Sequence, residues 1–166
     1  MEIKFRGKPL ADLYEEFTGE CIFDTEEFVY GNLICSGNER YIVGEVVEAS
    51  EDYIILEWWT PVDPATVGQY TGFKDTSGVD IYEGDWAEWN EYDYSGFPGR
   101  APERVTARGH IIFNEGSWII ASKTGARYLD MHALEDGYDG GDYGCVNKVR
   151  IIGNTHDNPE LLEATP

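Results

Sequence analysis

The chain has few basic residues for its size. Its 166 residues include 12 Lys and Arg against 32 Asp and Glu, which gives a formal net charge of −20 at pH 7. So negative a surface repels the phosphates of DNA and RNA and the headgroups of anionic membranes, so we expect no direct nucleic-acid or membrane binding. The charge also has a simpler explanation, because it keeps a small protein soluble.

Cysteines and long apolar runs are scarce as well. Cys21, Cys35 and Cys145 are odd in number, far apart and without a C-x-x-C pair, so a disulfide framework is not expected. We interpret all three as buried structural thiols. No apolar run approaches the ~20 residues of a membrane span, and residues 1–8 lack the apolar stretch of a secretory signal. These features predict a protein of a reducing cytoplasm.

The sequence lacks the motifs of common catalytic and metal sites. His110, His132 and His156 have no Cys or His at the spacing of zinc ligands, and the acidic run 135–142 lacks the ligand ladder of an EF-hand. The patterns G-x-S-x-G, G-x-x-x-x-G-K and G-x-G-x-x-G are missing too. We therefore predict no catalytic residue, no metal and no cofactor, and a protein that binds rather than catalyses.

What is present is a series of short β-strands. Runs rich in β-branched and aromatic residues, separated by turn residues, occupy 3–6, 28–35, 40–47, 53–59, 85–89, 105–113, 117–121 and 149–153. The pairs 40–47 with 53–59 and 105–113 with 117–121 are typical of hairpins. This pattern predicts a mainly-β chain forming a sheet sandwich or small barrel.

Three segments differ from this strand pattern. In residues 8–18, the apolar residues recur at spacings of three and four, which predicts a short N-terminal helix beginning near Pro9. Residues 90–103 form a polar loop that is long for a compact domain, and residues 135–143 form an acidic insert rich in Gly and Tyr. Between the strands, residues 75–78 predict a tight turn.

The most distinctive stretch is residues 67–85, which contains Gly-Gln-Tyr-Thr-Gly and Tyr-Glu-Gly-Asp. Together with residues 3–8, 29–31, 149–154 and 158–162, this stretch resembles the YopX family of phage and prophage proteins. The resemblance implies one YopX-like domain over residues 1–166, with strands and a short helix in 1–60. It also implies a small SH3-like barrel core in 61–158, carrying the inserts 90–103 and 135–143.

The resemblance implies no general enzymatic activity, and the family motif has a structural interpretation here. We predict that Tyr70, Ile81, Tyr82 and Trp86 pack in the core and that Asp85 caps local amides. Residues 8–24 and the two inserts are additions to the family's shorter pattern. A phage origin implies a place in the host bacterial cytoplasm.

Basic residues are concentrated between positions 100 and 127, which hold five of the twelve. Guanidinium groups bind phosphate in bidentate fashion, and nearby indoles can stack a base. The predicted ligand-binding residues are Arg104, Arg108, Trp118, Lys123, Arg127, Trp86 and Trp89. The alternative is that arginines on alternate strand positions pair with carboxylates of the next strand.

These features leave three functions open. The first is a phage counter-defence protein that sequesters a small nucleotide immune signal of the host, as a homo-oligomer with pockets between subunits. The second is an acidic protein–protein inhibitor, such as a DNA mimic, that blocks a host defence nuclease or complex. The third is a transcriptional or replication accessory. The basic segment favours the first slightly, because an acidic mimic does not need it.

Overall fold

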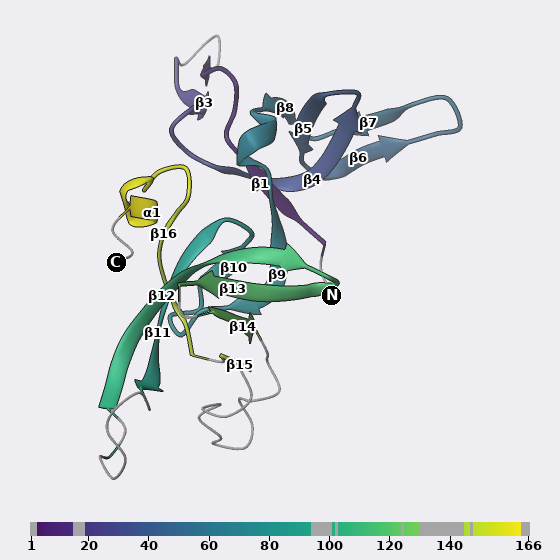
Figure 1. Ribbon diagram of the computed structural model, residues 1–166. Coiled ribbons are helices and arrows are strands. Elements are labelled where there is room, and N and C mark those ends of the chain that lie inside the picture. The colour runs from purple at the N-terminus through teal and green to yellow at the C-terminus, as the bar shows by residue number, and fades with distance from the viewer. Residues whose placement is uncertain are drawn as a thin grey trace. The chain divides into compact units, whose positions relative to one another are not determined.

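The computed structural model describes residues 3–14, 19–93, 101, 103–123, 125–129, 145–146 and 148–163. The protein is mainly β, as predicted, and its contacts divide the chain into two compact units, residues 1–70 and 71–166. Figure 1 shows both units. The division falls inside strand β9 (Gly68–Lys74).

Unit 1 is built on an antiparallel sheet. Its strand order is β9, β1, β4, β5, β8, with β1 at Phe5–Gly7, β4 at Val29–Ser36, β5 at Glu39–Val43 and β8 at Trp59–Val62. A short 3-10 helix, η1 (Pro64–Thr66), precedes β9. At Gly31 in β4 an added Cβ would collide with the carbonyl oxygen of Val43, so only glycine fits between these strands.

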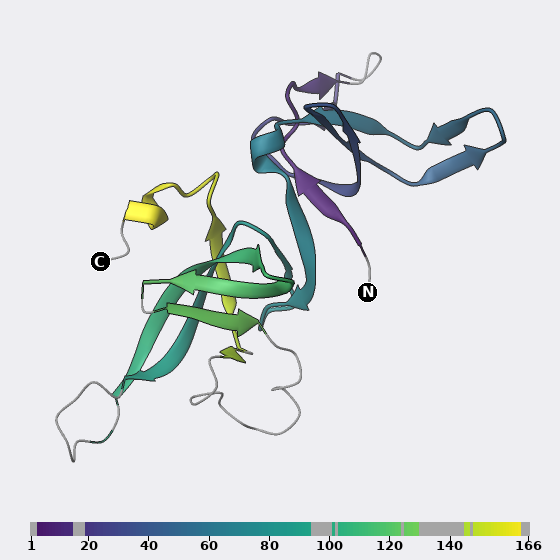
Figure 2. The ribbon, with the colours of Figure 1, turned by 45° about the vertical axis from the view of Figure 1, so that its right-hand side comes forward.

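Two further strand pairs belong to unit 1. Strand β2 (Leu13–Tyr14) pairs with β3 (Cys21–Phe23), and β6 (Val46–Ala49) pairs with β7 (Ile54–Leu56). The hairpin predicted from the segments 40–47 and 53–59 is therefore confirmed. Figure 2 shows β6 and β7 projecting from the ends of β5 and β8.

The short helix predicted over residues 8–18 is wrong for the part of it that the structure describes. Pro9 forms an isolated bridge to Val62, and Leu13 pairs with Phe23 in a strand. The three-and-four spacing misled because no core lies behind it: Leu10 and Tyr14 are exposed. Residues 15–18 lie outside the described ranges.

Unit 2 contains a six-stranded sheet in the order β15, β14, β13, β12, β11, β16. The bounds are β11 Asp85–Asp93, β12 Glu103–Asn114, β13 Ser117–Ser122, β14 Gly125–Leu129, β15 Cys145–Val146 and β16 Arg150–Asn154. All described pairings are antiparallel except that of β14 with β15. Strand β10 (Asp80–Tyr82) lies beside β9, and a short helix, α1, spans Glu160–Glu163.

The sheet of unit 2 curls around its apolar core. The core consists of Ile81, Ala87, Trp89, Ile111, Ile120, Leu129 and Val149. On the same face, Arg127 Nη2 of β14 lies 3.2 Å from Glu91 Oε2 of β11, although two strands separate β14 from β11 in the sheet. Such a contact requires a strongly curled sheet, because flat neighbouring strands lie about 4.8 Å apart.

Several smaller expectations are settled by the structure. Tyr70, Ile81, Tyr82 and Trp86 are buried, as predicted from the motif. Cys21 and Cys35 are exposed, which corrects the prediction of buried thiols. Residues 90–93 belong to β11 rather than to a loop, while residues 94–100, residue 102 and the insert 135–143 lie outside the described part of the chain.

Candidate functional site

A polar strip lies on the face of the unit 2 sheet opposite the core. Arg104 and Arg108 alternate along β12 with Ala107, which packs against the core, so both arginines project from the other face. The register places Glu88 of β11 opposite Arg108, and Arg150 of β16 opposite Glu88. Arg104, Arg108, Arg150 and Glu88 are called the basic strip below.

Glu88 is held between two arginines from neighbouring strands. Its Oε2 accepts a hydrogen bond from Arg108 Nε at 3.0 Å and forms an ion pair with Arg108 Nη2 at 2.9 Å, and its Oε1 accepts a hydrogen bond from Arg150 Nη2 at 2.8 Å. The hydrogen bonds from Arg150 and Arg108 lower the pKa of Glu88, so it is ionised at neutral pH. Three guanidinium groups against one carboxylate leave the strip with a net charge of +2.

Both guanidinium groups around Glu88 remain open to solvent. The side chains of Arg108 and Arg150 are 55% and 62% exposed, whereas that of Glu88 is 18% exposed. A guanidinium carries five N–H donors, and the contacts to Glu88 use only part of them. The strip can therefore donate further hydrogen bonds to an anion that approaches from solvent.

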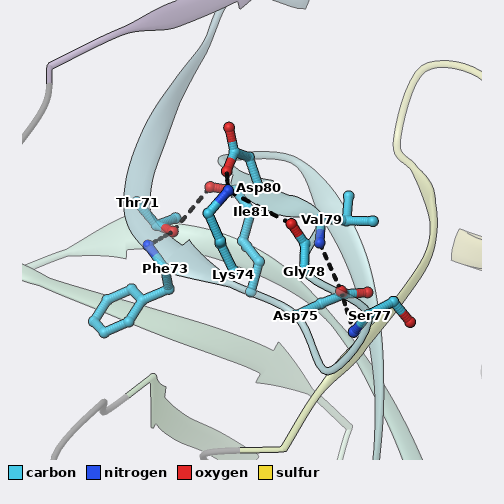
Figure 3. A network of polar contacts seen from close by, with 9 residues as sticks. All are labelled: Thr71, Phe73, Lys74, Asp75, Ser77, Gly78, Val79, Asp80 and Ile81. Atoms are coloured by element: carbon cyan, nitrogen blue, oxygen red, sulfur yellow. Dashed lines mark hydrogen bonds and ion pairs between the residues drawn. The ribbon is translucent and has the colours of Figure 1, made fainter.

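A buried aspartate ties the motif 67–85 to the strand that carries Arg150. Asp75 Oδ1 accepts from the amides of Ser77 at 2.7 Å and Val79 at 2.9 Å, which forms the tight turn predicted there (Figure 3). Asp75 Oδ2 accepts from the amide of Ile151 at 3.1 Å. This bond fixes β16 at Ile151, the residue after Arg150. The turn therefore helps to place Arg150 beside Glu88.

Polar contacts on either side of Asp75 complete this turn. Thr71 Oγ1 donates to the carbonyl of Ile81 at 2.8 Å, and Lys74 forms an ion pair with Asp80 (Figure 3). Farther along, the amide of Tyr82 donates to Asp85 Oδ2 at 2.8 Å, which confirms the predicted capping role of Asp85.

Trp86 and His110 lie on the same face as the basic strip, two residue pairs along the strands from Glu88 and Arg108. Their ring centroids are 5.4 Å apart. Burial lowers the pKa of His110, so its imidazole is neutral at pH 7 and adds no charge to the strip. Trp86 is 3% exposed, so its indole does not offer a face to a ligand in solvent.

The other predicted binding residues are not part of this strip. Trp89 is 2% exposed on the core face, where its Nε1 donates to Glu91 at 3.2 Å. Arg127 pairs with the same carboxylate, and Trp118 packs against the core. Lys123 is exposed in the turn between β13 and β14. The seven predicted residues are thus divided between two faces and a turn.

Sequence analysis missed two members of the strip, Arg150 and Glu88. Arg150 is far from Arg108 in sequence, and only the strand order β12, β11, β16 brings them together. The one available signal was a charged residue between the apolar Val149 and Ile151. The expectation that arginines pair with carboxylates of the next strand is confirmed for Arg108.

Comparison with known proteins gives the family. The model of the YopX protein family matches residues 23–163, most of the chain. The chain belongs to the YopX family. No curated protein matches it. Among solved structures, the crystal structure of protein EF1440 from Enterococcus faecalis is similar, with 21% identity and a TM-score of 0.42, covering 98% of this chain and 99% of the other.

Two features are absent from the described residues of this YopX protein. Among them, no three His, Cys, Asp or Glu side chains gather as a metal-binding group. Within the same ranges, no helix has the length and apolar character that crossing a membrane requires.

Proposed function

We propose that this YopX protein is a non-catalytic phage accessory protein that sequesters a small nucleotide immune signal of the host cell. The basic strip carries this proposal. In a chain with a formal charge of −20, it presents three guanidinium groups against one carboxylate. Phosphate groups are the natural ligands of such an arrangement, because guanidinium pairs with phosphate oxygens in two parallel hydrogen bonds.

The nucleotide is held mainly through its phosphates. Glu88 fixes Arg108 and Arg150 on either side of itself, so the two guanidinium groups lose little side-chain freedom when an anion binds. Because Trp86 is buried, base stacking on it is not part of this proposal. A second subunit that covers the strip would turn an open face into a pocket, so we propose a homo-oligomer in the host bacterial cytoplasm.

A second proposal concerns the fold of unit 2. We propose that the unit 2 sheet is the SH3-like barrel core of the family. The curl that brings Arg127 to Glu91 supports this, because it starts the closure that a barrel needs.

Native mass spectrometry of the purified protein with a panel of cyclic and linear nucleotides tests the function. We expect an oligomer that gains stoichiometric nucleotide mass and releases the nucleotide unchanged on denaturation. A released nucleotide of altered mass would show turnover and contradict the non-catalytic proposal. Absence of mass gain across the panel would contradict nucleotide sequestration.

Three variants then test the strip. Arg108→Gln with Arg150→Gln removes two charged donors and should weaken nucleotide binding about tenfold or more. Glu88→Gln removes the competing carboxylate and should strengthen binding. Arg40→Gln is the matched control, because Arg40 lies in unit 1 and donates to backbone oxygens of Gly37 and Glu39. If Arg108→Gln with Arg150→Gln leaves nucleotide binding unchanged, the strip is a structural salt bridge and not the site.

The acidic protein–protein inhibitor remains the second candidate. It is favoured by a different observation, the acidic hairpin β6–β7 of unit 1.

A further inference from the structure

The β6–β7 hairpin is the end of a longer ribbon. The amide of Gly44 donates to the carbonyl of Trp58 at 2.9 Å, and the amide of Glu57 donates to the carbonyl of Glu45 at 2.8 Å. These bonds continue the pairing of β5 and β8 into the hairpin. Almost every residue from 45 to 57 is solvent-exposed, so the hairpin packs against no other described part of unit 1 (Figure 2).

A register shift gives this hairpin one wholly apolar face. Val46 stands opposite Leu56 and Ala49 stands opposite Ile54, with an extra residue in β6 between Val46 and Glu48. Residues directly opposite each other share a face of a β-ribbon, and the bulge brings Val46 and Ala49 onto the same one. Val46, Ala49, Ile54 and Leu56 are called the apolar hairpin face. Val46 and Ile54 are 57% and 64% exposed.

The reverse face of the hairpin is different. Glu48 stands opposite Ile55 there, and the hydroxyl of Tyr53 donates to Glu48 Oε1 at 2.5 Å. The reverse face therefore mixes one apolar side chain with polar ones. It supplies a natural control for the apolar hairpin face, because Ile55 is the sequence neighbour of Ile54 and is also exposed.

The hairpin carries charge of one sign only. Its five carboxylates are Glu45, Glu48, Glu51, Asp52 and Glu57, and no Lys or Arg occurs between residues 41 and 73. The bond between Glu57 N and Glu45 O sets these two glutamates opposite each other across the ribbon. Like charges in that arrangement destabilise a β-pair, and a cationic partner would relieve the repulsion.

We infer that the apolar hairpin face docks on a protein that carries an apolar groove flanked by Lys and Arg side chains. The exposed apolar residues supply the buried centre of the contact, and the five carboxylates of the hairpin attract the cationic side chains of the partner. A second copy of this chain does not fit, because it would bring five further carboxylates against these five. The inference concerns unit 1 and is independent of nucleotide binding by the basic strip.

The test uses the full-length protein and three synthetic peptides of equal length. One alternates Leu and Lys, one alternates Ser and Lys with the same charge, and one alternates Leu and Glu. Binding is measured by fluorescence anisotropy of labelled peptide at two salt concentrations. We expect the Leu–Lys peptide to bind about tenfold more tightly than the Ser–Lys peptide, more weakly at high salt, and the Leu–Glu peptide not to bind.

A matched pair of variants locates the contact. Ile54→Ser should weaken binding of the Leu–Lys peptide about tenfold. Ile55→Ser should change it by no more than about twofold, because Ile55 lies on the reverse face. Neither variant alters the net charge. Equal effects of the two variants, or equal binding of the Leu–Lys and Ser–Lys peptides, would overturn the inference in favour of unspecific charge attraction. A change in oligomeric state caused by Ile54→Ser alone, seen by sedimentation, would overturn it in favour of a second copy. Arg108→Gln with Arg150→Gln should leave peptide binding unchanged.

Discussion

Two antiparallel ribbons of this protein, β6–β7 and β11–β12, use similar residues in opposite ways. Strands β11 and β12 have neighbours on both sides, β16 and β13, and bury Trp89 and Ile111 in a core. Strands β6 and β7 form a two-stranded sheet and leave Ile54 exposed. In unit 2 a glutamate sits between two arginines, whereas in unit 1 Glu45 faces Glu57.

The difference shows that an apolar strand pattern does not by itself distinguish core from surface. Both ribbons combine β-branched and aromatic residues with acidic ones. What separates them is whether further strands pair with the ribbon and cover its apolar face. A two-stranded ribbon alone is marginally stable in water, so its uncovered apolar face contributes little to folding and is open to contact.

The largest expected effect compares two isoleucines, one in each ribbon. Ile111→Ala removes a side chain that is fully buried in the core of unit 2 and should lower the free energy of unfolding by about 2–5 kcal/mol. Ile54→Ala should change it by less than about 0.5 kcal/mol, because the side chain is already in water. Urea unfolding followed by circular dichroism measures both. Similar losses in the two variants would mean that the hairpin is packed in solution.

Asp75 gives the next largest effect. Asp75→Ala leaves the amides of Ser77, Val79 and Ile151 without their acceptor and should cost about 2 kcal/mol in the free energy of unfolding. Asp75→Asn keeps one carbonyl oxygen and should cost less. A matched change in unit 1, Asp63→Ala, removes a single bond to the amide of Ala65 and should cost less again.

The same carboxylate predicts a pH dependence. Burial raises the pKa of Asp75, but the hydrogen bonds from Val79, Ile151 and Ser77 outweigh it, so the pKa lies below its ordinary value. Because the pKa is lower in the folded state, ionised Asp75 stabilises the protein at pH values above the unfolded pKa of about 4. This stabilisation is lost as the pH falls through the pKa of the folded state. Thermal unfolding between neutral and strongly acidic pH should show this loss, and Asp75→Asn should reduce it.

The smallest expected effect reverses a charge in the hairpin. Glu57→Lys places a cation opposite Glu45 and should stabilise the hairpin by about 0.2–1 kcal/mol. Glu88→Lys, in contrast, sets a cation between Arg108 and Arg150 and should destabilise unit 2. Amide hydrogen exchange resolves the two ribbons separately. If Glu57→Lys speeds exchange in the hairpin, the two glutamates do not repel each other there.

Much of the fold follows from local patterns in the sequence. The turn at residues 75–78 was predictable because Asp accepts backbone bonds and Gly78 adopts φ of 86°, which favours glycine. The hairpin between β12 and β13 followed from the β-branched and aromatic residues of 105–113 and 117–121 and the short gap between them. Residues 8–18 misled, since a spacing of three and four matters only when a core lies behind it.

The candidate site was less predictable than the fold. Sequence placed Arg104 and Arg108 correctly in one strand, but it grouped them with Arg127, which lies on the other face of the sheet. Arg150 joins Arg108 only through the strand order, which depends on the whole of unit 2. Trp86 was predicted both for the core and for the binding site, and Trp89 for the binding site alone, yet both are buried, because an indole suits a core as well as a binding surface.

Strand β9 has a practical consequence for any dissection of this protein. Gly68 and Gln69 pair with β1, whereas the strand continues past the unit boundary at Tyr70 to lie beside β10. The junction between the units is thus a shared strand and not a linker. Fragments cut at residue 70 would each lack part of β9. Complementary fragments should therefore overlap, for instance as 1–74 and 68–166, so that each contains the whole of β9.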